Sequence, residues 1–341
     1  MEEIAPKSSQ RASTGPLESV RLPLSVDNVI DQNSPTTASI GEEVKIAVVG
    51  GSGLIGRHLT VLLSGRGDEV VVVSRRATPV PGAHTVLRWD PVADAVPVAL
   101  GDVDAVVNLA GESIVGRWSD SKKRAIRESR VVTTTKLAEV VGSGGPSVLV
   151  NASAVGFYGD RGDAELTEQS APGTGFLADV CKEWEAAALT ARPRGARVVV
   201  ARTGLVLARE GGALPPMARA TRFGMGGPLG GGRQFYPWVH ISDVVGAIAW
   251  ALDNDSITGP MNVTAPIPVP QREIATALGQ ELHRPAIIPA LRPAIRLLLG
   301  EAADLVLMSQ RVVPRALTQS HYRFNAPNLA DALHRELGPR P

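Results

Sequence analysis

Disulfides, excess charge and long apolar runs are all missing from this 341-residue chain. Its single cysteine, Cys181, excludes an internal disulfide and is typical of a reducing compartment. The formal net charge of +1 gives no broad attraction to nucleic acid or to a membrane surface. No apolar run reaches the roughly 18 residues that a transmembrane helix needs. We therefore expect no nucleic-acid partner, no membrane partner and, by default, a cytoplasmic location.

Sequence signals for export and for metal binding are lacking as well. Residues 1–43 are rich in Ser, Thr, Pro, Asn and acids and show no sustained periodicity, so we expect a disordered leader. This leader has neither the basic start nor the apolar centre of a secretory signal. With one cysteine and six scattered histidines, no pair at metal-ligand spacing stands out. We expect no metal site, and no G-x-S-x-G motif points to a hydrolase.

What the chain does contain is a strand, a glycine turn, a helix and a second strand within about thirty residues. The apolar run 45–49 leads into the turn Gly50-Gly-Ser-Gly-Leu-Ile-Gly56, a helix-compatible segment follows over 57–64, and residues 69–74 form a β-branched run. This context indicates a dinucleotide site. We expect Gly51 to make the tight turn, Gly53 to let a pyrophosphate approach, and Gly56 to let the helix pack. The predicted cofactor residues of this turn are Gly50, Gly51, Gly53, Leu54, Ile55 and Gly56.

The end of the second strand predicts which dinucleotide binds. An NAD site usually has an acid there for the ribose 2′-hydroxyl. This chain has Ser74 and Arg75 instead, a hydroxyl and a guanidinium suited to phosphate oxygens. We therefore predict NADP(H) over NAD(H). The alternative is that Arg75 and Arg76 are solvated loop charges.

Strand-like and helical segments alternate through most of the chain, which predicts an α/β fold with a doubly wound parallel sheet of Rossmann type over 44–284. Residues 211–232 carry too many glycines and prolines for a regular element, so we expect a Gly-rich loop that is either a flexible surface loop or a substrate lid. The Leu/Ile/Ala-rich stretch 291–307 is predicted to be helical and packed. Further strands are expected over 85–90, 105–110, 147–151, 197–201 and 261–264, and helices over 119–141, 176–191 and 243–252.

Polar residues follow several strands, where the ligand crevice of a doubly wound sheet lies. Asn108 either ties adjacent loops together or caps a turn. Ser153 and Tyr158 are the candidate catalytic hydroxyls, with a strand-end cap and a packed aromatic as the alternatives. Arg130 is the member of a basic helical run that we expect to turn toward the cofactor. His240 and Asp243 resemble a catalytic pair, but we expect a structural role, with Asp243 capping the next helix.

These motifs resemble the short-chain dehydrogenase/reductase superfamily in its extended form, and most closely its atypical epimerase-family proteins, often labelled NAD-dependent epimerase/dehydratase. The resemblance covers about 44–337 and implies that residues 285–337 form a small C-terminal domain of unknown function. It also implies that NADPH is bound through residues matching Ser74, Arg75, Leu109, Ala110, Arg130 and Val206. The motifs are Gly50–Gly56, Asn108–Glu112 with Arg117-Trp118, Ser129-Arg130, Asn151–Gly159, Lys182–Glu185, Arg202–Gly204 and Gln234–His240.

The chain departs from the superfamily at its catalytic Tyr-x-x-x-Lys pair. Lys182 has Ala178 four residues before it, and alignment on Glu185 puts Leu177 and Cys181 at the two positions. The usual acid/base is therefore missing. We expect an NADP(H)-dependent oxidoreductase acting on an unknown small molecule. The alternative is a non-catalytic NADPH-binding sensor or partner-binding protein.

Overall fold

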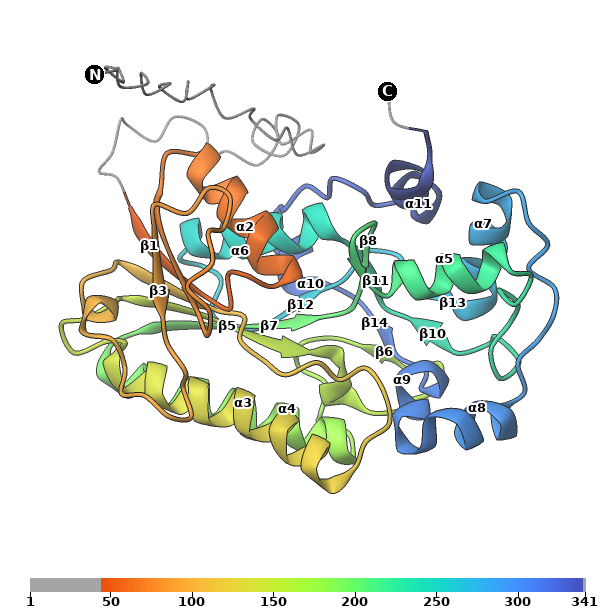
Figure 1. Ribbon diagram of the computed structural model, residues 1–341, viewed down its shortest axis with the longest axis horizontal. Coiled ribbons are helices and arrows are strands. Elements are labelled where there is room, and N and C mark those ends of the chain that lie inside the picture. Colours follow the sequence, from red (N-terminus) through yellow and green to blue (C-terminus); the bar gives the residue numbers. More distant parts are fainter. Residues whose placement is uncertain (1–43, 340–341) are drawn as a thin grey trace, which may run out of the picture.

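The computed structural model describes residues 44–339, so the leader 1–43 lies outside the described residues. Its centre is a seven-stranded sheet in the order β12-β7-β5-β4-β1-β2-β3, with every neighbouring pair parallel (Figure 1). This confirms the doubly wound Rossmann-type sheet. The strands are β1 Lys45–Val49, β2 Glu69–Ser74, β3 Thr85–Arg88, β4 Ala105–Asn108, β5 Val148–Ala154, β7 Arg197–Thr203 and β12 Gly259–Val263.

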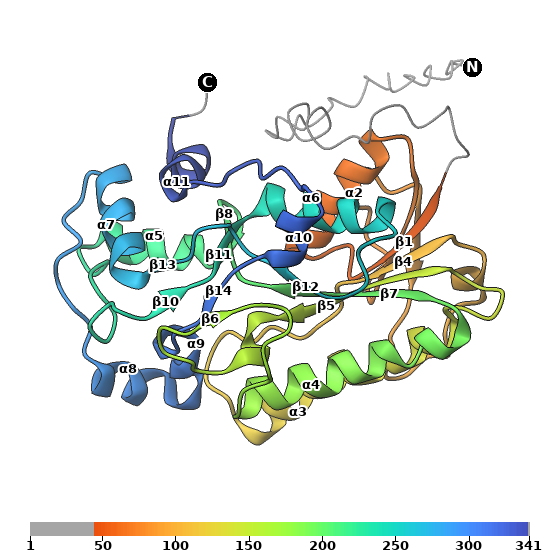
Figure 2. The same cartoon turned by 180° about the vertical axis from the view of Figure 1, so that it is seen from behind.

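Helices cover both faces of the sheet because both faces of its strands are apolar. Val70 and Val72 of β2 pack on one face with α2 (Leu54–Gly65) and α6 (Ile241–Asp253). Val71 and Val73 pack on the other with α3 (Asp120–Val140) and α4 (Phe176–Leu189). Figures 1 and 2 show these two helical layers above and below the sheet. The helices predicted over 119–141, 176–191 and 243–252 are thus present, with ends shifted by one or two residues.

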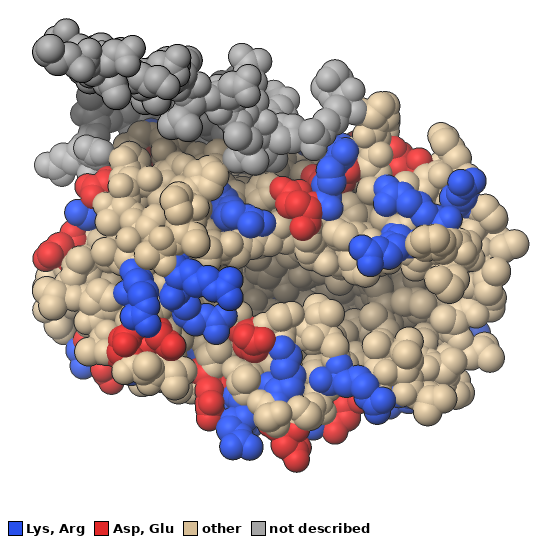
Figure 3. All heavy atoms as spheres, viewed as in Figure 1, with Lys and Arg blue, Asp and Glu red and all other residues tan. Residues whose placement is uncertain are grey.

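A second lobe lies beyond the carboxyl ends of the strands (Figure 1). Figure 3 shows a hollow between this lobe and the sheet half of the molecule. Its strands form small sheets: β8 Leu205–Ala208, β9 Gly211–Gly212 and β11 Trp238–His240 in one, β10 Phe235–Tyr236 with β13 Val269–Pro270, and β6 Glu165–Leu166 with β14 Arg311–Val312. Its helices are α5 Leu214–Arg222, α7 Gln271–Glu281, α8 Arg292–Leu299 and α9 Asp304–Leu307.

Helix α5 corrects the expectation that 211–232 has no regular element. The stretch Leu214–Arg222 contains no glycine, and its two prolines lie in the first turn, where a missing N–H breaks no helical hydrogen bond. Leu214 and Ala218 are buried on one face. Only the remaining part, 223–232, is irregular, and its glycines are concentrated there.

The C-terminal segment has a small buried cluster of its own, formed by Ile295, Ala303 and Leu307, and its last two helices pack on other cores. Helix α10 (Arg315–Gln319) buries Leu317 in the main core on the α2 and α6 side of the sheet, and α11 (Leu329–Leu337) buries Leu333 in the core of the second lobe. Residues 291–307 are mostly helical as predicted, but they are not packed throughout. Leu297 and Leu298 are 81% and 71% exposed, because α8 buries Ile295 instead.

None of the helices within 44–339 has the length and apolar composition needed to cross a bilayer. Within the same range, no cluster of three or more His, Cys, Asp or Glu side chains is arranged to hold a metal ion.

Candidate functional site: a cleft at the carboxyl ends of β1 to β4

A cleft of about 240 Å³ lies where β1, β2, β3 and β4 end. The crevice outside the carboxyl ends of parallel strands is the usual ligand site of such a sheet. The expected cofactor residues that line it are Gly50, Gly53, Ser74, Arg75, Leu109 and Ala110. It is completed by Val49, Ser52, Val73, Trp89, Asp90, Pro91, Val92, Gly111, Glu112, Ser129 and Thr133.

The glycine turn lets the backbone reach this cleft, but the roles of its individual glycines differ from those predicted. Gly50 adopts the left-handed φ of +82° that makes the turn, a role we had given to Gly51. Gly51 instead packs on β2, where an added Cβ would lie 2.8 Å from the Val72 side chain. A Cβ on Gly56 would lie 2.5 Å from the Gly51 Cα, so Gly56 lets the helix pack on the turn itself.

The amino-terminal end of α2 is open to an anion. Gly53 is its N-cap, no side chain caps it, and its first turn contains no acid. The unpaired amides and the helix dipole therefore suit a pyrophosphate. Leu54 and Ile55 contribute backbone only, since the Leu54 side chain packs near Gly211 and Ile55 packs on the main core.

Ser74 and Arg75 reach the cleft from the end of β2. The Ser74 hydroxyl donates to the Arg76 carbonyl at 2.5 Å, so it stabilises its own loop. Arg75 is exposed, and no ion pair of its side chain is recorded within 44–339. Across the cleft, the carboxylate of Asp90 accepts from the Val92 amide at 3.1 Å and is occupied in shaping the loop after β3.

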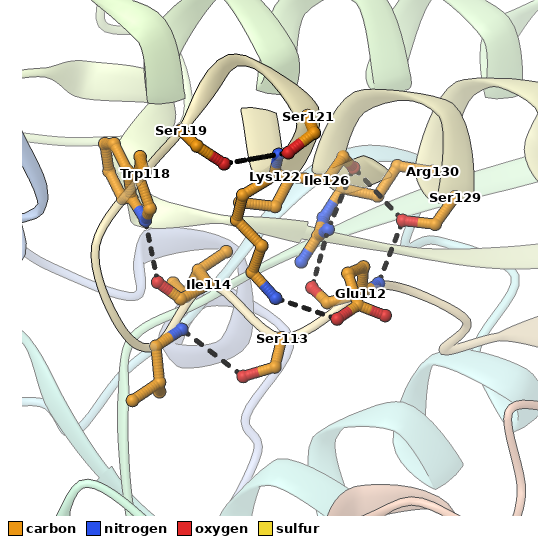
Figure 4. Close-up of polar contacts among 11 residues, drawn as sticks. Glu112, Ser113, Ile114, Trp118, Ser119, Ser121, Lys122, Ile126, Ser129 and Arg130 are labelled. Atoms are coloured by element: carbon orange, nitrogen blue, oxygen red, sulfur yellow. Dashed lines mark hydrogen bonds and ion pairs between the residues drawn. The ribbon is translucent and has the colours of Figure 1, made fainter. Parts of the chain in front are cut away.

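The loop after β4 is fastened to α3 by three polar contacts (Figure 4). Arg130 donates to the carbonyls of Glu112 and Ile126, each at 3.0 Å, and burial lowers the pKa of its guanidinium. The Glu112 amide donates to the Ser129 hydroxyl at 2.9 Å. Lys122 donates to the Glu112 carboxylate at 2.8 Å, and this hydrogen bond lowers the carboxyl pKa. Arg130 therefore supports the cleft from behind instead of lining it.

Glu112 lines the cleft but is not among the predicted site residues. Its position at the end of the motif Asn108–Glu112 is the sequence feature that could have identified it as a site residue. A Cβ on the neighbouring Gly111 would lie 3.1 Å from the Arg130 guanidinium carbon, which shows how closely the loop rests on α3.

Asn108 plays both of the roles considered for it. Its amide nitrogen donates to Thr134 at 2.9 Å and to Asn151 at 2.7 Å, which ties β4 to α3 and β5. Its carbonyl oxygen accepts from the Ala110 amide at 3.2 Å, which caps the turn into the cleft.

Val206 lies on β8, opposite Val239 of β11, and its carbonyl accepts from the Ala213 amide. It packs on the main core and is absent from the cleft lining.

The model matching "NAD dependent epimerase/dehydratase family" covers residues 46–264, and one for "Domain of unknown function (DUF1731)" covers 292–336. The chain is 41% identical to Epimerase family protein Mb2239 of Mycobacterium bovis over 84% of its own length and 96% of the relative's. It is 38% identical to Epimerase family protein SDR39U1 of Mus musculus over 85% and 98%. The chain belongs to the NAD-dependent epimerase/dehydratase family.

Solved structures agree with this membership. A crystal structure of human epimerase family protein SDR39U1 (isoform 2) with NADPH matches with a TM-score of 0.77 at 36% identity, covering 86% of this chain and 99% of that one. A nucleoside-diphosphate sugar epimerase from Corynebacterium glutamicum matches with a TM-score of 0.72 at 37% identity, covering 87% and 59%. MoeE5 in complex with UDP-glucuronic acid and NAD, at 22% identity, shares the fold.

The two candidate catalytic hydroxyls of this family member lie in a buried network. Ser153 donates to Glu185 at 2.7 Å, and Glu185 forms a two-pronged ion pair with Arg202 at 2.8 and 2.9 Å. Arg202 also donates to the Tyr158 hydroxyl at 2.9 Å, which in turn donates to Asn262 at 2.7 Å. Ser153 is 4% exposed and Tyr158 is fully buried. The packed-aromatic alternative therefore describes Tyr158, whereas Ser153 binds Glu185 instead of capping its strand, and neither residue lines the cleft.

Helix α4 presents apolar groups to the end of β5. Leu177 and Cys181 both lie next to Gly156, in the turn that follows β5. Burial raises the pKa of the Cys181 thiol to about 11, so the thiol stays protonated and unreactive at neutral pH. Lys182 faces away and pairs with Asp179 at 2.7 Å.

His240 and Asp243 do serve structure, as expected, but the cap is His240. Its ring nitrogen accepts from the Ser242 amide at the start of α6. Asp243 lies inside the helix and accepts from the amides of Asn325 and Ala326 at 2.6 and 3.0 Å. It thereby anchors the chain between α10 and α11 to α6.

Proposed function

We propose that this chain is an NADP(H)-dependent oxidoreductase of the cytoplasm that acts on a small molecule held in the hollow between its two lobes. The observation that carries the proposal is the cleft end formed by Ser74 and Arg75. No acid stands at the end of β2, and Arg75 reaches the cleft without an ion-pair partner recorded in 44–339. A guanidinium there favours a ribose 2′-phosphate through charge-assisted hydrogen bonds.

The parts of the cleft have separate tasks in this proposal. The open amides of α2 bind the pyrophosphate, and the Gly50 turn lets it approach the backbone. The Lys122–Glu112 pair and Arg130 hold the loop after β4 in place. Hydride transfer belongs to the nicotinamide, and the protein orients it toward the hollow.

Water is the proposed proton source, because the tyrosine hydroxyls are committed elsewhere. Besides Tyr158, Tyr236 donates to the Val306 carbonyl at 2.6 Å and Tyr322 donates to Asp243 at 3.2 Å. These are the three tyrosines of the chain. The helix that carries Tyr-x-x-x-Lys in catalytic relatives has Leu177 and Cys181 beside the end of β5.

Cofactor preference is tested by measuring dissociation constants for NADPH and NADH on wild type and Arg75→Ala. We expect the substitution to weaken NADPH about tenfold or more and to leave NADH nearly unchanged, because a hydrogen bond to a charged group contributes about 1.5–3 kcal/mol. Arg76→Ala is the matched control, since Arg76 is an exposed neighbour outside the cleft lining. Equal affinity of the wild type for both nucleotides would refute the preference.

Turnover is tested by following nicotinamide absorbance with panels of carbonyl compounds and sugar nucleotides. Oxidation of NADPH by a member of the panel supports the oxidoreductase. Saturable NADPH binding without turnover on broad panels favours the second candidate, described next.

The second candidate is a non-catalytic NADPH-binding protein that senses cofactor or binds a protein partner. The burial of Ser153 and Tyr158 in the Glu185–Arg202 network favours it. Sensing requires a partner whose affinity differs between the NADPH-bound and free states. Pull-downs that recover the same partners at the same level with and without NADPH would exclude sensing.

A further inference from the structure

A second cavity, of about 200 Å³, lies in the second lobe between α5 and the end of α11. No residue of its lining is shared with the cofactor cleft. Its apolar wall is continuous with the core of the lobe, to which Leu214 and Leu337 belong. The lining residues are Arg209, Leu214, Pro215, Ala218, Arg219, Arg222, Glu336 and Leu337.

Three guanidinium groups meet at this cavity. Arg219 and Arg222 are three residues apart in the last turn of α5 and so share a face. No ion pair of either side chain is recorded in the described part of the chain. Arg209 follows β8, and its side chain donates to the Gly338 carbonyl at 3.2 Å, which is a neutral partner.

The one carboxylate in the lining is already occupied. Glu336 accepts from the Arg209 backbone amide at 2.5 Å and pairs with His240 at 2.9 Å. Burial is the largest single influence on its pKa and opposes ionisation, but the hydrogen bond and charge of His240 together with the backbone amide and guanidinium of Arg209 outweigh it, and the carboxyl pKa is lowered. Glu336 is therefore ionised at neutral pH and directed toward His240, and the three cations of the lining exceed its single negative charge.

The position of Arg219 and Arg222 also has an explanation within the helix. Cations in the last turn interact favourably with the helix dipole, by about 0.3–1 kcal/mol each. That accounts for their presence on α5, but it does not account for Arg209, which comes from another element and converges on the same cavity. The three arginines are exposed, and their like charges together raise the positive potential at the cavity, which favours an anion.

We propose that this cavity is a second anion-binding site, taking a phosphate or diphosphate group. Guanidinium groups bind phosphate oxygens in pairs of parallel hydrogen bonds, and three of them from two directions match a tetrahedral anion. The apolar wall of Leu214, Ala218 and Leu337 limits solvent screening on one side. The ligand is identified by this chemistry as free phosphate, diphosphate or the phosphate end of a metabolite.

The site is connected to the cofactor cleft through the β8–β9 hairpin. Glu210, the residue after Arg209, pairs with His58 of α2 at 2.8 Å. Gly211 lies against Leu54 at the start of the same helix. An anion that draws Arg209 toward the cavity therefore acts on the hairpin that contacts the pyrophosphate-binding helix. This second part of the proposal, that the bound anion changes NADPH affinity, rests on the proposed cofactor function.

The first experiment titrates pyrophosphate into the full-length protein by calorimetry with NADPH present at saturation, which blocks the cleft. We expect one saturable site in the wild type and at least tenfold weaker binding in Arg219→Gln/Arg222→Gln. The charge-matched control is Arg296→Gln/Arg315→Gln, whose arginines form exposed ion pairs with Asp304 and Glu165 outside the cavity. It should bind like the wild type.

Three outcomes overturn the site: no saturable binding in the wild type, equal binding by the cavity variant, or equal losses in both double variants, which would mean non-specific electrostatics. Melting temperatures of the variants exclude misfolding as the cause. If the chain binds no NADPH, the same comparison with pyrophosphate alone still decides whether the cavity binds the anion, so the two proposals fail separately.

The second experiment measures the NADPH dissociation constant with and without pyrophosphate in the wild type and in the cavity variant. Pyrophosphate also competes with NADPH at the cleft, to the same extent in both proteins. For each protein we take the ratio of the NADPH dissociation constants with and without pyrophosphate, and dividing the wild-type ratio by that of the variant removes this competition. We expect a quotient at least threefold from one. A quotient of one overturns the connection between the sites.

Discussion

Glu185 and Arg202 show what a single buried contact does in this protein. Their ion pair joins α4 to β7, holds Ser153 of β5, and stacks the guanidinium 3.5 Å above the Phe157 ring. Both side chains are less than a tenth exposed. The network therefore fixes the ends of the strands that border the hollow.

Glu185→Gln should lower the free energy of unfolding by about 3–5 kcal/mol, because it leaves the Arg202 charge buried without its partner. The measurement is urea denaturation followed by tryptophan fluorescence. Glu183→Gln, on the same helix, is the control: Glu183 forms a half-exposed pair with Arg127 at 3.3 Å, and its loss should cost less than about 1 kcal/mol. Equal effects of the two substitutions would contradict the role of the network.

Cys181 should resist thiol reagents in the native protein at pH 8. Only the thiolate reacts, and burial raises the pKa of this thiol to about 11. Labelling with a chromogenic disulfide should be slow until guanidinium unfolds the chain, and then reach one thiol per molecule, since the chain has one cysteine. Rapid stoichiometric labelling of folded protein would show that Cys181 is accessible.

At the scale of elements, the first strand, glycine turn and helix behave as one unit. The local sequence predicted this unit well, because a glycine-rich turn and the start of a helix depend on residues within about ten positions in the chain. The predicted role of Gly51 was wrong because the contact that defines it lies outside this range. Gly51 packs closely on Val72 of β2, a separate strand.

Gly56→Ala should disrupt this unit. The new Cβ would lie 2.5 Å from the Gly51 Cα and 2.6 Å from the Gly50 carbonyl oxygen, so backbone must move. We expect a loss of about 1–3 kcal/mol in stability, as for other overpacked sites, and weaker nucleotide binding by calorimetry. Gly101→Ala is the control, since its added Cβ meets nothing within 4 Å. Unchanged binding in Gly56→Ala would show that the turn is adaptable.

Helix α5 illustrates where element prediction failed. The glycine and proline content of 211–232 as a whole hid the difference between the helical stretch 214–222 and the irregular stretch 223–232 that follows it. The helix is stabilised by burial of Leu214 in a core that it shares with residues of α7 and α11, far along the chain. Such stabilisation comes from tertiary packing, which a local count cannot contain.

At the scale of the whole molecule, each of the last two helices packs on the core of a different half. Leu317 of α10 lies in the core on the α2 and α6 side of the sheet, and Leu333 of α11 lies in the core of the second lobe. The C-terminal segment therefore links the two halves, in addition to the earlier segments of the chain that pass from one half to the other.

Leu317→Ala should destabilise the whole chain by about 2–5 kcal/mol, because it leaves a cavity in the main core. Unfolding should remain a single transition when tryptophan fluorescence and nucleotide binding are compared. A separate early transition that leaves nucleotide binding intact would show that the C-terminal segment folds independently. Ala substitution at exposed Leu297 serves as control and should change stability little.

The sequence by itself determined the alternating strands and helices, the doubly wound sheet and the glycine turn, because these depend on apolar periodicity and on residues close in the chain. Only the tertiary structure decided what distant polar groups do. It placed Ser153 and Tyr158 in a buried network, joined His240 to Glu336, and brought Glu112 into the cleft. The reason is physical: a polar side chain takes its role from the partner it meets, and these partners lie far away in the chain.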